Sequence, residues 1–434
     1  MAWGTRRHAR SRTPLGTADE LLEGSGDLAV ALQEELVRRN AVAPALGGPG
    51  ESAKADFLRQ WIEAEGLGPV ARVSGSDGGM ERPNLLVRRA GTASDRCLWF
   101  LCHLDVAPAG DPEAWRGDPF RLRREGDKLV GRGVEDNHQG IISVLLALRA
   151  LVQTGIPLPR DVGLALVADE ETGGPWGLDL VLRQRPVPFG PGDAFLLPDA
   201  GDEEGGVIGV AEKGVLGVRL RVLGHGASAA VPITGRNALA AGAHLLVALE
   251  ALAHRFPDRD PLFLPSHCTF EPTRHLESPG DLHTVPGEDV FHLDVRVLPT
   301  VRLDDVLTAI REIATEVGRT HRVAIQVDPL VREDPAPPTP SSHPLVRLLA
   351  RAVRQVYGVE ARPRGIGGGT LATRVRRGGW PAVVWARQDG TAHQPNEYCW
   401  LPNILGDARV LLRLMIEEER PEGTEPGGAA QGGT

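Results

Sequence analysis

The chain has 434 residues, of which 41% are hydrophobic and 24% are charged, and its formal net charge is −9. A single hydrophobic core stops growing at about 250–300 residues, so this length predicts two domains. The negative charge argues against a nucleic-acid-binding protein, which usually carries a basic face. No apolar run in the sequence reaches the roughly 18 residues that a membrane-spanning helix needs, so we expect a globular protein that does not bind membranes.

Two features of the sequence indicate a cytoplasmic protein. The basic segment Met1–Leu15 is not followed by an apolar stretch with a small-residue cleavage site, so we expect no secretory signal. The cysteines show neither CxxC spacing nor a dense pattern, which fits small buried side chains in a reducing compartment. They are Cys97, Cys102, Cys268 and Cys399.

The first part of the chain alternates between helical and strand-like patterns. Leucines at four-residue spacing and a second apolar series predict helices over residues 17–65. Short apolar runs with polar flanks then predict buried strands at Cys97–Cys102, Val162–Ala168 and Ala194–Leu197, and Ile141–Leu151 is predicted to be helical. Strands that alternate with helices are typical of an α/β fold with a mostly parallel sheet flanked by helices.

From Gly214 the pattern changes. Val215–Val222 and Asp289–Leu298 alternate between apolar and polar residues, which predicts half-exposed strands, whereas Ala238–Phe256 and Leu303–Val317 are expected to be helical. This pattern predicts a smaller α+β domain.

The α/β pattern returns after the proline-rich connector Pro335–Pro340, with a helix expected at Leu345–Val356 and a buried strand at Ala382–Trp385. We therefore predict a catalytic domain made of residues 1–213 and 332–420, interrupted by an inserted domain of residues 214–331. Residues 421–434 are rich in glycine and polar residues, and we expect a disordered tail there.

Five short segments carry chemically useful side chains, and each follows a predicted buried strand or begins a helix. In open α/β sheets, ligands bind outside the carboxyl ends of the strands, so these segments are candidates for one site. Taken singly, each has an ordinary explanation: a satisfied strand-end histidine, an N-cap aspartate, a solvated acidic loop, a plain turn or a loop histidine. The residues are His103 with Asp105, Asp136, Glu170 with Glu171, Asp199, and His393.

Taken together, the five segments favour a metal centre. Mixed oxygen and nitrogen ligands suit Zn²⁺, with Mn²⁺ or Co²⁺ as alternatives. Two divalent ions carry four positive charges, which three carboxylates and one hydroxide would balance if one carboxylate bridges them. Neighbouring glutamates on an extended segment point in opposite directions, so one can bind metal while Glu170 is left as a base. The expected ligands are His103, Asp136, Glu171, Asp199 and His393.

In this order along the chain, the segments resemble the di-zinc metallopeptidases and amidohydrolases that include glutamate carboxypeptidase, acetylornithine deacetylase, succinyl-diaminopimelate desuccinylase and aminoacylase. The resemblance extends from the first predicted helix to about Leu401. It implies that His103 and Asp199 bind one metal ion and that Glu171 and His393 bind the other. Asp136 matches the carboxylate that bridges the two ions.

The resemblance also gives roles to the two remaining carboxylates. Asp105 matches the residue that orients His103, and Glu170 matches the general base. The implied reaction is hydrolysis of the amide bond of an N-acyl amino acid by a hydroxide that bridges two metal ions. A metallo-carboxypeptidase or dipeptidase acting on small peptides is the close alternative, and a non-catalytic binding protein on the same fold is a more distant one. The resemblance further implies that the inserted domain is a lid through which two copies form a homodimer.

Four further residues are candidate substrate contacts. Arg296 resembles a lid arginine that grips the substrate carboxylate, although a surface ion pair would also explain it. Gly369 and Thr370, in the run Gly367–Thr370, resemble the family's carboxylate-binding loop. Asn237 resembles a family position at the start of a lid helix, where an N-cap is the alternative.

The sequence departs from the family pattern at the lid histidine that is thought to stabilise the oxyanion. Ser228 stands at that position, and His225 lies three residues earlier. His283 stands where the family often has an asparagine. We hypothesise that His283 takes over part of the oxyanion role, with His225 as the other candidate.

Overall fold

The computed structural model describes residues 13–276 and 281–418, and the chain divides into two compact units. The first unit contains the residues up to 208, residues 341–362 and the residues from 380 onward, and the second contains residues 209–340 and 363–379. The expected tail at 421–434 lies outside the described residues. Residues 332–340 and 363–379 pack with the second unit rather than the first, because Thr339 and Gly365 donate backbone hydrogen bonds to Val210 and Leu262.

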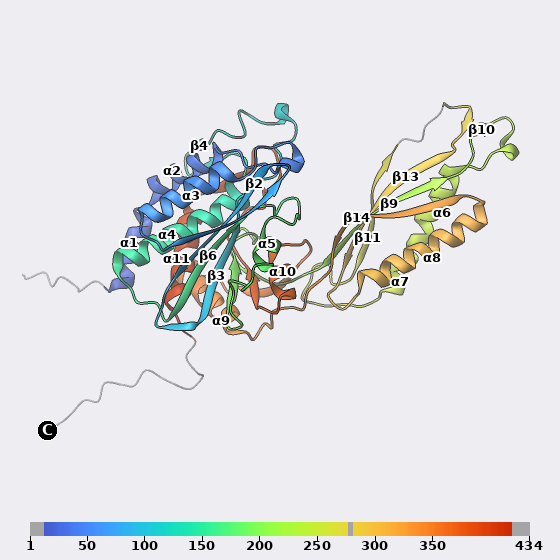
Figure 1. Ribbon diagram of the computed structural model, residues 1–434. Coiled ribbons are helices and arrows are strands. Elements are labelled where there is room, and N and C mark those ends of the chain that lie inside the picture. Colours follow the sequence, from blue (N-terminus) through green and yellow to red (C-terminus); the bar gives the residue numbers. More distant parts are fainter. Residues whose placement is uncertain (1–12, 277–280, 419–434) are drawn as a thin grey trace, which may run out of the picture. The chain divides into compact units, whose positions relative to one another are not determined.

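The first unit is built on a large, mostly parallel sheet with helices packed against it, which confirms the α/β fold class (Figure 1). The strand order is β1-β2-β6-β3-β7-β16, and β8 and β15 follow where the chain passes into the second unit. Strand β3 pairs in parallel with β6 and β7, and β7 pairs in parallel with β16, whereas β1 and β2 are antiparallel. The strands are β1 (Val70–Asp77), β2 (Met80–Arg89), β3 (Ala93–His103), β6 (Arg160–Val167), β7 (Ala194–Leu197), β8 (Val207–Glu212), β15 (Arg362–Ile366) and β16 (Ala382–Val384).

The helices of this unit follow the apolar periodicity of the sequence. Helix α4 is buried along most of its length and packs against α1 and α11, and α3 packs against the β1–β2 hairpin. A separate three-stranded sheet, β17-β5-β4, lies close in sequence to two predicted site segments. These elements are α1 (Pro14–Glu23), α2 (Gly26–Val37), α3 (Ser52–Ala64), α4 (Gly140–Thr154), α5 (Leu178–Leu182), α9 (Pro344–Tyr357), α11 (Leu401–Ile416), β4 (Arg123–Glu125), β5 (Lys128–Val130) and β17 (Tyr398–Trp400).

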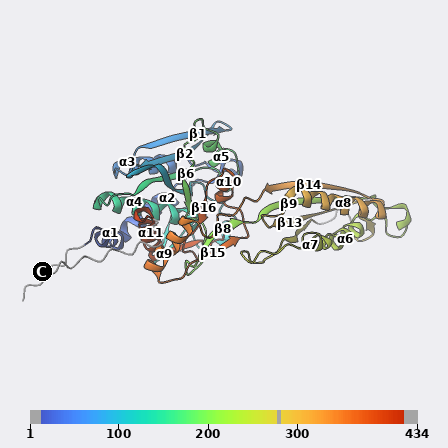
Figure 2. The same ribbon diagram turned by 90° about the horizontal axis from the view of Figure 1, so that it is seen from below.

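The second unit is a four-stranded antiparallel sheet with helices on one face (Figure 2). Its strand order is β11-β13-β9-β14, and the helices bury one side chain in two from β9 and β13. The helix expected at Ala238–Phe256 is divided at Glu250 into α6 and α7. The elements are β9 (Gly214–Leu223), β11 (Thr269–Leu276), β13 (Glu288–Val297), β14 (Ala324–Glu333), α6 (Ala238–Leu249), α7 (Ala251–Arg255), α8 (Leu303–His321) and α10 (Leu371–Arg377).

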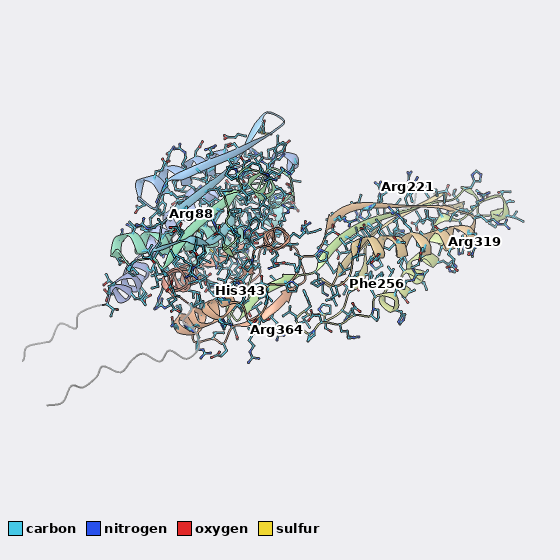
Figure 3. The ribbon with its side chains drawn as sticks, turned by 60° about the horizontal axis from the view of Figure 1, so that its bottom comes forward. Arg88, Arg221, Phe256, Arg319, His343 and Arg364 are labelled. Atoms are coloured by element: carbon cyan, nitrogen blue, oxygen red, sulfur yellow. The ribbon has the colours of Figure 1, made fainter. Side chains whose placement is uncertain are left out.

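Alternation along the strands leaves the other face of this sheet polar. Val218, Leu220 and Val222 of β9 point into the core, so Arg221 projects from the opposite face, where it pairs with Glu288 at 2.6 Å (Figure 3). Since successive residues of a strand point to opposite faces, the pattern explains how one strand supplies both a core and a polar surface.

A short two-stranded sheet, β10 (Ala227–Ser228) with β12 (Thr284–Val285), also belongs to the second unit. Within the described residues, no helix has both the length and the apolar character needed to cross a bilayer.

Candidate metal centre

The predicted ligand segments lie at the carboxyl ends of strands in the first unit. His103 is the last residue of β3, Glu171 lies in the loop after β6, and Asp199 lies in the loop after β7. Asp136 lies in the kinked helical turn Val134–Gln139 that leads into α4, and His393 lies between β16 and β17. Because β3, β6, β7 and β16 run parallel, their carboxyl ends meet at one sheet edge, which brings these loops together.

The carboxylate of Asp136 lies between two imidazoles. Its Oδ1 is 2.7 Å from Nε2 of His103, and its Oδ2 is 3.0 Å from Nε2 of His393. Asp199 lies 3.3 Å from the same nitrogen of His103, and Glu171 lies 3.1 Å from the same nitrogen of His393. The five side chains therefore form two histidine–carboxylate pairs that share one central carboxylate.

Asp105 contacts both its neighbour on the strand end and a second loop. Nδ1 of His103 lies 3.0 Å from the backbone carbonyl of Asp105 and 3.6 Å from its carboxylate. The carboxylate accepts hydrogen bonds from the backbone N–H groups of Glu170 and Glu171, at 3.1 and 3.0 Å. Asp105 thus fixes the ring of His103 mainly through its carbonyl, while its buried carboxylate positions the two glutamates.

The environment of Glu170 favours the protonated carboxyl. Burial raises the pKa of Glu170 well above its usual range, and the negative charges of Asp199, Asp136 and Asp105 raise it further, against the opposing effect of His103. Two divalent cations in this site would offset these negative charges and favour the carboxylate that a base requires.

The surrounding carboxylates raise the pKa of both imidazoles. Burial alone lowers the pKa of His103, but Asp136, Asp105 and Asp199 raise it well above its usual range. Hydrogen bonds to Asp136 and Glu171 raise the pKa of His393 to about 10. The negative charge of the carboxylates therefore favours a positively charged group beside them, either a protonated imidazole or a metal ion.

The donor set fits divalent metal ions. One ligand atom from each of His103, Asp136 and Glu171 lies within 4.8 Å of the others, so these three side chains are close enough to share a metal centre. Oε1 of Glu171 is buried and has no hydrogen-bond partner in the described part of the chain. A buried carboxylate oxygen without a partner is costly, and a cation is the partner that this set of imidazoles and carboxylates suits.

Two predicted substrate contacts lie together in the second unit. Arg296 of β13 pairs with Asp294 through two bonds of 2.7 and 3.0 Å, and its Nη1 donates to the carbonyl of Gly367 at 3.2 Å. Thr370 is the N-cap of α10, and its hydroxyl donates to the buried carboxylate of Glu212 at 2.9 Å. Gly369, between these contacts, has only the side chain of Glu333 near the position of an added Cβ. The structure therefore brings Arg296 to the loop that was expected to share its carboxylate ligand.

Asn237 is the N-cap of α6, since its side chain accepts a hydrogen bond from the N–H of Ala240 at 3.0 Å. The N-cap role, which the sequence offered as the alternative to a substrate contact, therefore accounts for the position of Asn237.

The two candidate oxyanion histidines both lie near Ser228. Strands β10 and β12 pair Ser228 with Thr284, and the carbonyl of His283 accepts the N–H of Ala229 at 2.7 Å. His225 pairs through its backbone with Arg236. Both side chains are exposed, and His283 directly precedes Thr284, the residue paired with Ser228.

Several site residues were not singled out from the sequence. Asn137 donates to Asp199 at 2.8 Å, and Lys54 of α3 lies 2.7 Å from His138, two residues beyond Asp136. Burial lowers the pKa of Lys54 to about 7. A usable signal existed for Lys54, because it shares the apolar stripe of α3 with Leu58 and Ile62.

Comparison with known proteins gives relatives that match almost the whole chain. The model of peptidase family M20/M25/M40 matches residues 99–417. An uncharacterised metallohydrolase of Methanocaldococcus jannaschii is 29% identical over 405 residues, which cover 89% of this chain and 98% of the relative. The succinyl-diaminopimelate desuccinylase of Rhodospirillum centenum is 26% identical over 392 residues, with coverages of 89% and 96%. The solved structure of the di-peptidase Dug1p from Saccharomyces cerevisiae has a similar fold, with a TM-score of 0.71 at 14% identity and coverages of 92% and 98%.

Proposed function

The chain belongs to peptidase family M20/M25/M40, whose model matches more than half of it, and on this premise we propose that it hydrolyses the amide bond of N-acyl amino acids. Membership makes the chain a metallohydrolase acting on amide bonds. The substrate class, the use of two metal ions and the role of each residue are our proposal. The desuccinylase named among the relatives supports the substrate class, since that enzyme removes an acyl group from an amino acid.

The observation that carries the proposal is the position of Asp136 between His103 and His393, with Asp199 and Glu171 on either side. We propose that His103 and Asp199 hold one divalent ion, that Glu171 and His393 hold the other, and that Asp136 bridges them. Zn²⁺ is the ion that this ligand set suits best, with Co²⁺ or Mn²⁺ as alternatives. When bound, such ions lower the pKa of water and polarise a carbonyl group.

In this mechanism the protein's own groups move one proton and hold the substrate. Glu170 takes a proton from the attacking water and passes it to the departing amine after the amide carbon has become tetrahedral. Asp105 holds the backbone of Glu170 in place for both transfers. Arg296 and the Gly367–Thr370 loop would bind the carboxylate of the amino acid that is released, because an arginine fork matches a carboxylate.

The exposed His283 is our candidate donor to the oxyanion, with His225 as the second candidate. An oxyanion that develops on the amide oxygen needs a donor placed beforehand, and Ser228 cannot supply an imidazole. We also propose that the second unit is a lid through which two copies form a homodimer. The four free, buried cysteines support a cytoplasmic location.

A substrate panel tests the proposal directly. The full chain would be purified, treated with a chelator, reloaded with Zn²⁺, Co²⁺ or Mn²⁺, and assayed on N-acetyl and N-succinyl amino acids and on dipeptides. We expect metal-dependent release of the free amino acid from an N-acyl amino acid. Cleavage of dipeptides or of peptide carboxyl termini alone would favour the peptidase alternative. Metal binding without turnover on any substrate would favour a binding protein.

A further inference from the structure

Two buried glutamates flank the proposed metal ligands without being ligands themselves. Glu135 immediately precedes Asp136, and Glu397 follows His393 by four residues. Each is only 1% exposed. A buried carboxylate is costly unless its oxygens accept several hydrogen bonds, so the donors around each glutamate show what it holds in place.

Glu397 holds the backbone of the segment that contains Asp136. Its Oε1 accepts the N–H groups of Glu135 and Asp136, at 3.0 and 3.1 Å. Its Oε2 accepts the N–H of Gly133 at 3.0 Å and Nη1 of Arg132 at 2.7 Å. One carboxylate from the His393 segment thus satisfies three backbone donors of the turn that presents Asp136.

Glu135 holds the segment that leads to His393. Its Oε1 accepts the N–H of Asp389 at 2.9 Å. Its Oε2 accepts the N–H of Ala392 at 2.9 Å and the hydroxyl of Thr391 at 2.8 Å, together with the N–H of Thr391. Of these donors, the N–H of Ala392 belongs to the residue directly before His393.

The two glutamates therefore form a reciprocal clamp, in which each segment is held by a carboxylate of the other. Arg132 adds a third link, because its Nη2 donates to the carbonyl of His393 at 3.3 Å. His393 needs such support, since its φ of 64° is in the left-handed region that costs a non-glycine residue energy, and its side chain is 60% exposed. The clamp fixes the backbone that carries the imidazole, whose Nε2 contacts Asp136 and Glu171.

We infer that Glu135 and Glu397 are positioning residues that set the separation of Asp136 and His393 and thereby the affinity for the metal ion between them. The inference rests on the proposed metal centre. A glutamine at either position keeps the size of the side chain but replaces one accepting oxygen with an NH₂ group. That group would face backbone donors, so part of one segment would be released.

If the two glutamates only stabilised the fold, their loss would lower the free energy of unfolding without changing metal affinity. Asp193 provides the matched control in the same unit, because it is also buried and accepts the N–H groups of Cys97 and Gly190 and the indole N–H of Trp99, at 2.9, 2.9 and 2.8 Å. None of these donors belongs to a proposed ligand segment. Asp193→Asn should lower stability without changing the metal centre.

The experiment measures Co²⁺ affinity of the full chain by competition with a chromophoric chelator, alongside denaturant unfolding of the metal-free proteins. We expect Glu135→Gln and Glu397→Gln each to weaken Co²⁺ binding by about 10–100-fold, the usual effect of losing an outer partner of a metal ligand. The visible spectrum of the bound Co²⁺ should change in both variants. The double variant should lose little more than either single one, because both glutamates serve one clamp.

The outcomes separate the clamp from the proposed function. Wild-type affinity and spectrum in both glutamine variants, with stability lowered as in Asp193→Asn, would overturn the clamp. No Co²⁺ binding by the wild-type chain would instead overturn the metal centre itself. If a glutamine variant does not fold, Thr391→Val removes one donor to Glu135 and should weaken Co²⁺ binding in the same direction, and wild-type affinity in that variant would count against the clamp.

Discussion

Glu170 is the residue at which metal binding and chemistry should separate. Within the described residues it is not a member of the two histidine–carboxylate pairs, and its backbone N–H is held by Asp105. Glu170→Gln should therefore retain the wild-type metal content while turnover falls by about 10²–10⁴-fold, the usual contribution of a general base. Metal analysis and steady-state kinetics on the same preparation test this expectation. Near-normal turnover would show that another group accepts the proton.

At the residue scale, the sequence indicates which side chains are candidate ligands, but it does not indicate which side chains contact one another. His103, Glu171 and Asp199 could be found because each follows an apolar run, and ligands bind outside the carboxyl ends of such strands in an α/β sheet. The contacts of Lys54 with His138 and of Asn137 with Asp199 depend on how α3 and the Val134–Gln139 turn pack. No local periodicity encodes that packing.

At the scale of elements, strand β2 carries a buried charge network that supports the loop of the two glutamates. Arg82 is fully buried and forms two bonds to Glu51, at 2.8 and 2.6 Å, and a third to Asp169 at 2.9 Å. Arg82→Met leaves two buried carboxylates without a cation. It should lower the free energy of unfolding by about 3–5 kcal/mol.

Arg88 is the matched control on the same strand. Its side chain is 42% exposed and pairs with Asp161 at 2.8 Å (Figure 3). Arg88→Met should cost no more than about 1 kcal/mol, as is usual for exposed ion pairs. Urea unfolding of both variants tests this difference. Equal decreases in the free energy of unfolding would show that the buried network stabilises the fold no more than the exposed ion pair.

A second prediction for an element concerns the β10–β12 pair. If His283 supplies the oxyanion donor, His283→Ala should lower kcat by about 10²–10³-fold with a smaller effect on KM, since the interaction forms in the transition state. His225→Ala should leave kcat close to the wild-type value. A large decrease in kcat in His225→Ala alone would assign the oxyanion role to His225. Full activity in both variants would show that neither histidine stabilises the oxyanion.

Helices and strands with a clear apolar periodicity were predicted correctly, whereas elements that bury polar residues among apolar ones were not. The apolar runs of β3, β6 and β7 and the stripe of α4 fall where the sequence places them. The β1–β2 hairpin was not predicted, because β2 buries Arg82 and Asn84 among its apolar residues and so shows no simple alternation. The division of Ala238–Phe256 into α6 and α7 also left no signal, because the apolar pattern continues through the junction.

For the whole molecule, pH should control how strongly metal stabilises the fold. Asp136 and Glu171 raise the pKa of His393 to about 10 in the folded protein, compared with 6.5 in the unfolded chain. Protonation of His393 therefore contributes its full stabilisation of the metal-free fold at pH values below 6.5. That contribution is lost as the pH rises through about 10. A metal ion must displace this proton, so the gain in Tm on adding Zn²⁺ should grow from about pH 6 to about pH 8.5. A gain that is constant or shrinks over this range would contradict the assignment of His393 as a ligand.

The central claim is that His103, Asp136, Glu171, Asp199 and His393 together hold a pair of divalent ions. Metal stoichiometry of the purified full chain, measured by mass spectrometry of the bound elements after reloading and desalting, tests it most directly. The account predicts two equivalents for the wild-type chain and the loss of at least one in Asp136→Ala, which lacks the shared carboxylate. A wild-type chain that retains no divalent metal, or an Asp136→Ala variant that retains the full complement, would contradict it.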